Sequence, residues 1–264
     1  MLSDALEEYF YLPLNDYYLC YFDVLGYKEY MRSKANSHKK YLINMILSNG
    51  AIESQIKRLN APFPIHYKGY SDNFLIYFEK GNVSEYDALK LLATLMRKIQ
   101  TRLLCESKMI IRGGITIGEF YADERIIFGE GLIKAYELES YYAKNPRIII
   151  DPNCFKEVAS KLENDKALLK DIDGLYYINY FYNEGFLKLN SGYIISLVNT
   201  YCNYQDIELS VDQITQREKV ISKYLWMLVK FNEACKIIGA EKLEINYELK
   251  INERVLKQEI YCQK

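Results

Sequence analysis

The hydrophobic pattern of the first 150 residues alternates between two spacings. Some stretches are apolar or aromatic at nearly every position, or at every second position, as in strands of a buried sheet. Others repeat their apolar residues every three or four positions, as amphipathic helices do. The expected strands are 17–24, two short strands within 65–79 around a tight turn at 69–73, then 108–121, 125–128, 147–151 and 174–183. The expected helices are 27–34, 38–60, 84–104, 129–145, 152–163 and 210–239.

The order of these elements predicts the fold class. Strands and helices are mixed, and the two strands within 65–79 form a hairpin, which favours antiparallel pairing. We therefore expect an α+β sandwich, with helices on one face of a mostly antiparallel sheet. The expected domains are a lead at 1–16, a main domain at 17–186, and a mostly helical C-terminal extension at 187–264.

Composition and charge exclude several classes of partner. The 264 residues are 50% hydrophobic and 26% charged, with a net charge of -1, so no broad basic field predicts a nucleic-acid polymer as partner. No apolar run approaches the roughly 20 residues that span a bilayer. The opening "MLSDALEEYF" lacks the pattern of a signal peptide, and the six cysteines form no closely spaced pairs. We expect a cytoplasmic protein with reduced thiols.

Two aspartates follow apolar strands. Asp23 ends the run "YYLCYFDV", and Asp72 lies in the hairpin "KGYSDNF". If these strands are neighbours, the carboxylates meet at one edge of the sheet, where at about 4–5 Å they repel by roughly 3–4 kcal/mol. A divalent cation between them removes that repulsion, and Mg²⁺ is usually held by one or two carboxylates plus substrate phosphates. Taken singly, Asp23 fits a helix cap and Asp72 a turn residue.

Several segments, in order, resemble the class III nucleotidyl cyclases. "FDVLGYKEY" resembles the signature of their first strand, and "KGYSDNFLIYF" resembles the hairpin that carries their second metal-binding aspartate. "IRGGITIGEF" and "IFGEGLIKAYELESYYAKNPRIIID" resemble their later strand, helix and closing strand. The resemblance covers about residues 17–151. Within the superfamily, "RGGITIG", "AYELE" and "PRIIID" look most like the bacterial pyrimidine cyclases of Pycsar anti-phage defence.

The resemblance implies an activity and a set of site residues. A class III cyclase forms a 3′,5′-cyclic nucleotide and pyrophosphate from a nucleoside triphosphate, using two Mg²⁺ or Mn²⁺ ions, in sites between the subunits of a homodimer. A pyrimidine cyclase makes cyclic CMP or cyclic UMP, which activates a separate effector. The implied metal ligands are Asp23, Val24 and Asp72; the implied catalytic residues are Asp23, Asp72, Arg112 and Lys134; and the implied nucleotide-binding residues are Val24, Leu25, Gly26, Tyr27, Lys68, Tyr70 and Arg147.

Two positions depart from the family pattern and leave other functions open. Purine cyclases carry Asn and Arg where this chain has Ile133 and Glu137. A degenerate cyclase domain that binds a nucleotide or a partner protein is therefore one alternative. A palm-type or diguanylate-cyclase-like nucleotidyltransferase is another, although "YSDNF" lacks the glycines and glutamate of the corresponding "GGDEF" hairpin.

Overall fold

The computed structural model describes residues 14–32, 36–164, 166–202 and 211–245. The chain forms two compact units, Met1–Tyr180 and Phe181–Lys264. Most of the lead expected at 1–16 lies outside the described residues. The domain limits expected at 17–186 and 187–264 stay a prediction. Within the described part of the chain, every helix is too short or too polar to cross a membrane.

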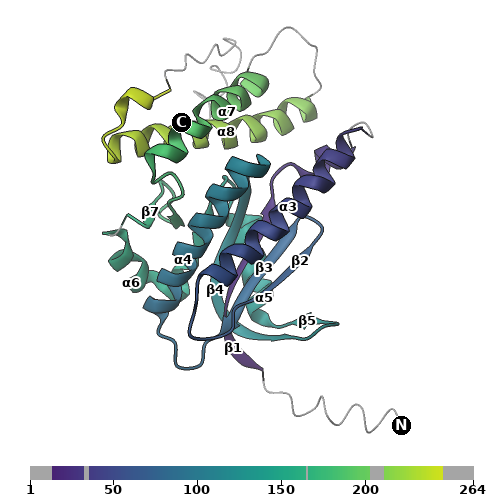
Figure 1. The fold of residues 1–264 in the computed structure, drawn as a ribbon, viewed down its shortest axis with the longest axis vertical. Helices are drawn as coiled ribbons and strands as arrows, with labels where there is room; N and C mark the ends of the chain where they lie inside the picture. Colours follow the sequence, from purple (N-terminus) through teal and green to yellow (C-terminus); the bar gives the residue numbers. More distant parts are fainter. Residues whose placement is uncertain (1–13, 33–35, 165, 203–210, 246–264) are drawn as a thin grey trace. The chain divides into compact units, whose positions relative to one another are not determined.

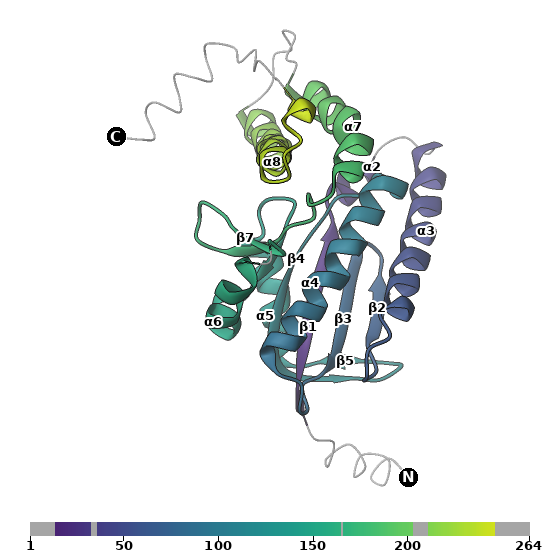
Figure 2. The same cartoon turned by 60° about the vertical axis from the view of Figure 1, so that its left-hand side comes forward.

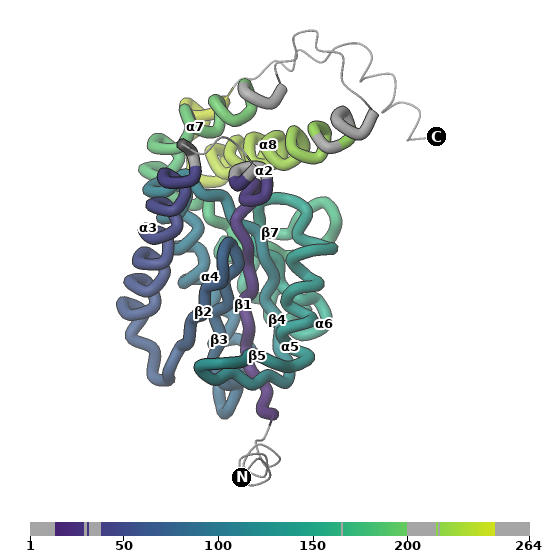
Figure 3. The backbone as a smooth tube through the Cα atoms, turned by 90° about the vertical axis from the view of Figure 1, so that its right-hand side faces the viewer, coloured from purple at the N-terminus to yellow at the C-terminus, as the bar shows by residue number. Residues whose placement is uncertain are grey.

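The first unit is built on one mixed sheet (Figure 1). Its strands, in spatial order, are β2 (His66–Tyr70), β3 (Asn73–Glu79), β1 (Asn15–Val24), β4 (Ile111–Ala122), β6 (Ile148–Ile150), β8 (Tyr176–Ile178) and β7 (Leu168–Lys170), and β5 (Ile127–Phe128) pairs with the end of β4. Figure 3 shows β1 between β3 and β4. Only β4 and β6 pair in parallel, so the α+β prediction of a mostly antiparallel sheet is confirmed.

Helices cover both faces of this sheet. The first unit contains α2 (Tyr27–Arg32), α3 (Asn36–Arg58), α4 (Glu85–Arg102), the π-helical turn η1 (Leu103–Ser107), α5 (Glu130–Glu137), the π-helical turn η2 (Leu138–Tyr142) and α6 (Pro152–Glu163). Residues of α3, α4 and α6 share the larger core with alternate residues of β1, such as Cys20 and Phe22. Figure 2 views the sheet from the side that α4 covers.

The opposite face of the sheet packs against α5 and is called here the α5 face. Leu19 of β1, Leu75 of β3 and Ala135 of α5 form its smaller core. The sequence analysis placed the helices on one face, and α5 is the exception. The helix expected at 129–145 also changes form after Glu137, where it continues as the π-helical turn η2.

The close approach of α5 to β4 depends on glycine. A Cβ built on Gly118 of β4 lies 2.7 Å from the Cα of Gly131 in α5, closer than packed atoms tolerate. We expect Gly118→Ala to destabilise the first unit by about 1–3 kcal/mol through overpacking, measured as a lower midpoint of chemical denaturation. The control is Gly50→Ala in α3, where an added Cβ meets nothing within 4 Å and helix propensity improves. Equal stability of the two variants would contradict this packing.

The second unit is helical over its described residues. It contains α7 (Glu184–Cys202), α8 (Val211–Ile237) and the short 3₁₀ helix η3 (Glu241–Leu243). The sequence pattern predicts α8, whereas α7 and strand β7 were not predicted individually. Among the described cysteines, Cys20, Cys105, Cys154 and Cys235 form no disulfide.

Candidate active site

The two aspartates singled out by sequence lie at the same end of the sheet. Asp23, the second-last residue of β1, pairs with Asn73 at the start of β3. Asp72 is the residue before Asn73, and its carbonyl accepts a hydrogen bond from the Val24 amide at 3.0 Å. Strand register therefore brings together two acids that are separated by 49 positions in the chain.

A chain of hydrogen bonds places Asp72 within reach of the α5 face, where Asp23 also lies. The Tyr21 hydroxyl donates to Asn73 Oδ1 at 2.5 Å, and Asn73 Nδ2 donates to Asp72 Oδ1 at 3.1 Å. Tyr21 and Asp23 point to the same face because side chains alternate along a strand. Burial raises the pKa of Asp72, hydrogen bonds from its own backbone and Ser71 lower it, and the charge of Asp23 raises it further.

Arg112 joins this cluster from the neighbouring strand β4. Asp23 and Arg112 are direct partners in the pairing of β1 with β4. Arg112 Nε donates to Asp23 Oδ1 at 3.1 Å, and Arg112 Nη2 donates to Asp23 Oδ2 at 3.3 Å. The structure thus brings together three of the four residues to which the sequence analysis gave a catalytic role.

Glu139 is the site residue that sequence reasoning missed. Its carboxylate forms an ion pair with Arg112 Nη2 at 2.6 Å, and its side chain is only 3% exposed. Burial, followed by the nearby Asp23 charge, raises the pKa of Glu139 to about 7. It is the last residue of "AYELE", but nothing in that segment separates buried Glu139 from exposed Glu137 two positions earlier. The π-helical turn η2, a feature often found at functional sites, begins at the residue before it.

Two basic residues that the sequence analysis assigned to the site, Lys134 and Arg147, have other ion-pair partners. Lys134 pairs with Glu130 on α5 at 2.9 Å, and this partner raises the pKa of Lys134. Arg147 is almost fully buried and forms ion pairs with Asp171 and Asp173. The geometry therefore corrects two assignments, because it gives Arg147 a structural role and does not bring Lys134 to the two aspartates.

The residues after Asp23 have partners of their own. The Val24 amide bonds the Asp72 carbonyl, and the Leu25 amide bonds the Ile110 carbonyl at 2.8 Å. Both N–H groups are thus already bonded to backbone carbonyls in this conformation, and the nucleotide-binding role of Val24 and Leu25 stays a prediction. Gly26, with a φ of +86°, turns the chain into α2. The Tyr27 ring packs on Tyr41 of α3.

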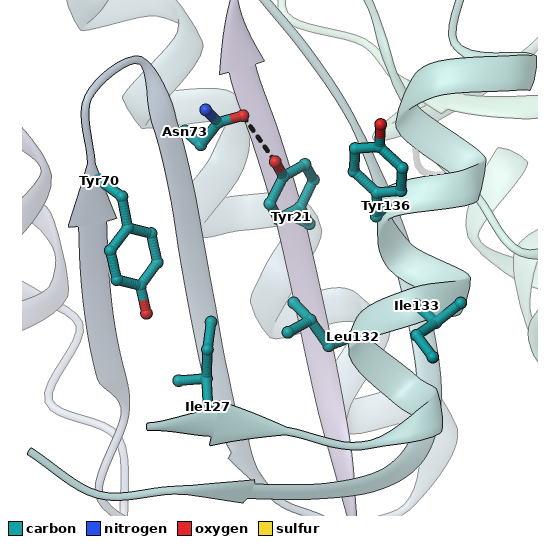
Figure 4. A pocket seen from close by; sticks show the side chains of 7 residues that line it. All are labelled: Tyr21, Tyr70, Asn73, Ile127, Leu132, Ile133 and Tyr136. Carbon is teal, nitrogen blue, oxygen red and sulfur yellow. Dashed lines mark hydrogen bonds between the residues drawn. The ribbon is translucent and has the colours of Figure 1, made fainter. Parts of the chain in front are cut away.

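A pocket of about 380 Å³ opens on the α5 face beside the aspartates (Figure 4). Its lining is mainly aromatic and aliphatic, with the Tyr21–Asn73 hydrogen bond at one end: Tyr21, Tyr70, Asn73, Ile127, Leu132, Ile133 and Tyr136. Tyr70 thus lines the pocket, and its contact with a base stays a prediction. Lys68, two residues earlier on β2, donates instead to the backbone carbonyl of Asp123.

The donor set at Asp23 and Asp72 fits a hard divalent cation. Two carboxylates are the usual protein contribution to a Mg²⁺ site that substrate phosphates complete. In the described ranges, no group of three or more His, Cys, Asp or Glu side chains forms a self-sufficient metal site. A metal here would therefore depend on Asp23, Asp72, the Val24 backbone and oxygens from a ligand.

Comparisons with known proteins give structural similarity only. No protein-family model and no curated protein matches the chain. The guanylate cyclase domain of RhGC from Catenaria anguillulae in complex with GTP is 12% identical, with a TM-score of 0.44 over 62% of this chain and 96% of that chain.

The adenylyl cyclase CyaB from P. aeruginosa is 14% identical, with a TM-score of 0.45 over 62% of this chain and 93% of that one. A bacterial light-regulated adenylyl cyclase is 12% identical, with a TM-score of 0.42 over 73% of this chain and 65% of that one. At these values, the similarity by itself assigns neither a substrate nor a reaction to this chain.

Proposed function

We propose that this protein is a divalent-metal-dependent nucleotidyl cyclase, which converts a nucleoside triphosphate to a 3′,5′-cyclic nucleotide and pyrophosphate. The observation that carries the proposal is the adjacency of Asp23 and Asp72 at the mouth of a tyrosine-lined pocket. The carboxylates suit metal-bound phosphates, and the pocket suits the flat face of a base. Both lie on one face of the sheet, as a single bound nucleotide requires.

In the proposed reaction, the ribose 3′-hydroxyl attacks the α-phosphorus. A new O–P bond forms, the bond from the α-phosphorus to the bridging oxygen of pyrophosphate breaks, and the hydroxyl proton is released. Two Mg²⁺ or Mn²⁺ ions, when bound, supply charge for the attacking and leaving oxygens. Asp23 and Asp72 hold the triphosphate through these ions, while Tyr70 and Tyr136 contact the base. Asn73 fixes the Asp72 carboxylate by its hydrogen bond.

The proposal extends to the substrate and the biological setting. CTP or UTP is the favoured substrate, and the product is an alarm signal that activates a separate effector in cytoplasmic anti-phage defence. This part depends on the resemblance of "RGGITIG", "AYELE" and "PRIIID" to the pyrimidine cyclases. Ile133 and Glu137 also replace the Asn and Arg of purine cyclases.

A product assay tests the proposal. Purified full-length protein is incubated with each of the four labelled nucleoside triphosphates and Mn²⁺ or Mg²⁺, and the products are separated by chromatography and identified by mass. We expect a cyclic mononucleotide, formed most rapidly from CTP or UTP. A linked dinucleotide would favour the diguanylate-cyclase-like alternative, and no product from any of the four would reject nucleotide turnover.

One observation favours a second candidate. Arg112 bonds both oxygens of Asp23, which suits a degenerate cyclase domain that binds a nucleotide or a partner protein without turning it over. Calorimetry separates the two candidates, because the degenerate domain binds nucleotide and releases no product.

We also propose a head-to-tail homodimer with its sites at the interface. Large apolar side chains stand exposed on α5 and beside the pocket, including Phe128, Ile133 and Tyr136. Patches of this kind mark protein contacts. We expect Ile133→Glu to shift the protein from dimer to monomer by at least about tenfold in dissociation constant, measured by analytical ultracentrifugation.

A matched control is available on the other side of the sheet. Ile46 of α3 is as exposed as Ile133, at 62% against 59%, and α3 packs on the core opposite the α5 face. Ile46→Glu is expected to leave the dimer intact. Dissociation by Ile46→Glu but not by Ile133→Glu would move the interface to α3.

A further inference from the structure

We propose that Glu139 is a positioning residue that holds Arg112 when the Asp23 carboxylate turns from the guanidinium to a divalent cation. The inference deepens the proposed function and rests on it, since Asp23 is a metal ligand only if that function is correct. It gives a role to a buried carboxylate to which the sequence analysis assigned none. It also explains how an aspartate that is already bonded to arginine can still bind a metal ion.

The distances around Arg112 are unequal. Its Nη2 lies 2.6 Å from Glu139 Oε1, whereas its contacts to Asp23 are 3.1 and 3.3 Å. The shortest contact, to Glu139 Oε1, is an ion pair without hydrogen-bond geometry, whereas both contacts to Asp23 are hydrogen bonds. Because the Asp23 side chain is 17% exposed and that of Glu139 only 3%, the contact with Asp23 is the one that a cation can reach and displace.

The Glu139 carboxylate is itself held in place. The Ser140 hydroxyl donates to its second oxygen, Oε2, at 2.7 Å. Oε1 is thereby left facing Arg112. The side chains of Arg112 and Asp23 are 20% and 17% exposed, against 3% for Glu139. The side of the cluster open to solvent, and thus to a cation, is the Asp23 side.

Charge determines what happens when a cation arrives. Arg112 and a divalent cation compete for the same Asp23 oxygens. A mostly buried guanidinium that loses its only anionic partner is destabilised, because its desolvation is no longer offset. With Glu139 ionised, Arg112 keeps a buried partner after Asp23 is released. Without Glu139, Arg112 retains Asp23, and the cation binds less tightly.

A double-mutant cycle on Mn²⁺ affinity tests this without using catalysis. The proteins are the full-length wild type, Glu139→Gln, Arg112→Gln and the double variant, without nucleotide, all measured in the same buffer. Free Mn²⁺ is measured by electron paramagnetic resonance. We expect Glu139→Gln to weaken Mn²⁺ binding about tenfold and Arg112→Gln to strengthen it. In the Arg112→Gln background, Glu139→Gln is expected to change the affinity less than about twofold.

Other results would overturn the inference. Unchanged Mn²⁺ affinity in Glu139→Gln would do so, and so would a tenfold loss that persists in the Arg112→Gln background, because Glu139 would then act on the metal by its own charge. Glu139→Asp, which keeps the charge, is expected to stay within about threefold of the wild type, and circular dichroism confirms the fold of each variant.

Different experimental results would refute the role of Glu139 and the proposed cyclase activity. A wild-type protein that forms cyclic nucleotide but shows no effect of Glu139 on Mn²⁺ affinity refutes only the inference. A protein that binds Mn²⁺ as expected through the cycle but forms no product from any nucleotide refutes only the cyclase activity. Absence of Mn²⁺ binding by the wild type overturns the inference. The proposed cyclase activity is then tested by the product assay alone.

Discussion

Asp23→Asn is expected to lower the rate of cyclic nucleotide formation by at least about a thousandfold while leaving the fold intact. Asparagine keeps the size of aspartate and can still contact Arg112, but it removes the negative charge that a divalent cation needs. Arg112 retains Glu139 as an ion-pair partner, so no buried charge is left alone. Turnover at saturating triphosphate and Mn²⁺ measures the effect, and thermal unfolding confirms the fold.

The same strand provides the control. Asp16 lies on β1, seven positions before Asp23, and is exposed. Asp16→Asn makes the same chemical change far from the cluster and is expected to keep near wild-type turnover. Asp72→Asn is expected to match Asp23→Asn, because the two carboxylates hold the same ions. Turnover by Asp23→Asn within about tenfold of the wild type would exclude metal chemistry at this end of the sheet.

Arg147→Met is expected to destabilise the first unit by about 3–5 kcal/mol, the cost typical of removing one partner from a buried ion pair. The substitution leaves the buried Asp171 carboxylate without the guanidinium that neutralises it. At roughly 2–4 °C per kcal/mol for a domain of this size, the midpoint of thermal unfolding should fall by about 6–20 °C. Differential scanning calorimetry measures the shift.

A second variant separates a structural role from a nucleotide-binding role. In Arg147→Met/Asp171→Leu, both buried charges are replaced by apolar groups, so much of the lost stability should return. Nucleotide affinity of the folded double variant should equal that of the wild type. A stable Arg147→Met protein that has lost nucleotide binding would restore the role that the sequence analysis assigned to Arg147.

Arg112 and Arg147 show which part of the site could not be predicted from the sequence. Arg112 and Arg147 both adjoin apolar strand segments, "IRGGITIG" and "PRIIID", and nothing in their local patterns separates them. Strand pairing separates them: Arg112 lies opposite Asp23, whereas Arg147 precedes β6 and meets Asp171 and Asp173 in the loop that follows β7. The partner of a charged side chain is a long-range contact, which local periodicity does not encode.

The partner of Lys68 is also a long-range contact that the local sequence does not predict. The family resemblance implied that Lys68 contacts the base, yet its amino group bonds the Asp123 carbonyl in the turn between β4 and β5. That partner is 55 positions away. Tyr70, by contrast, lies on the pocket because alternation along a strand and the hairpin register already place it on the same face as Asn73.

The meeting of Asp23 with Asp72 required that their strands be neighbours, which the pairing of β1 with β3 provides. Most strands and helices of the first unit, and the mostly antiparallel character of its sheet, follow from the sequence alone. Hydrophobic periodicity and hairpin signals carry this information because they are local. Only the tertiary structure decided that α5 lies on the opposite face from α3, α4 and α6, that Glu139 shares Arg112 with Asp23, and that Arg147 is buried in an ion cluster. These features depend on packing and on charge pairing between distant segments, and the energy of a buried charge is set by whichever partner the fold brings to it.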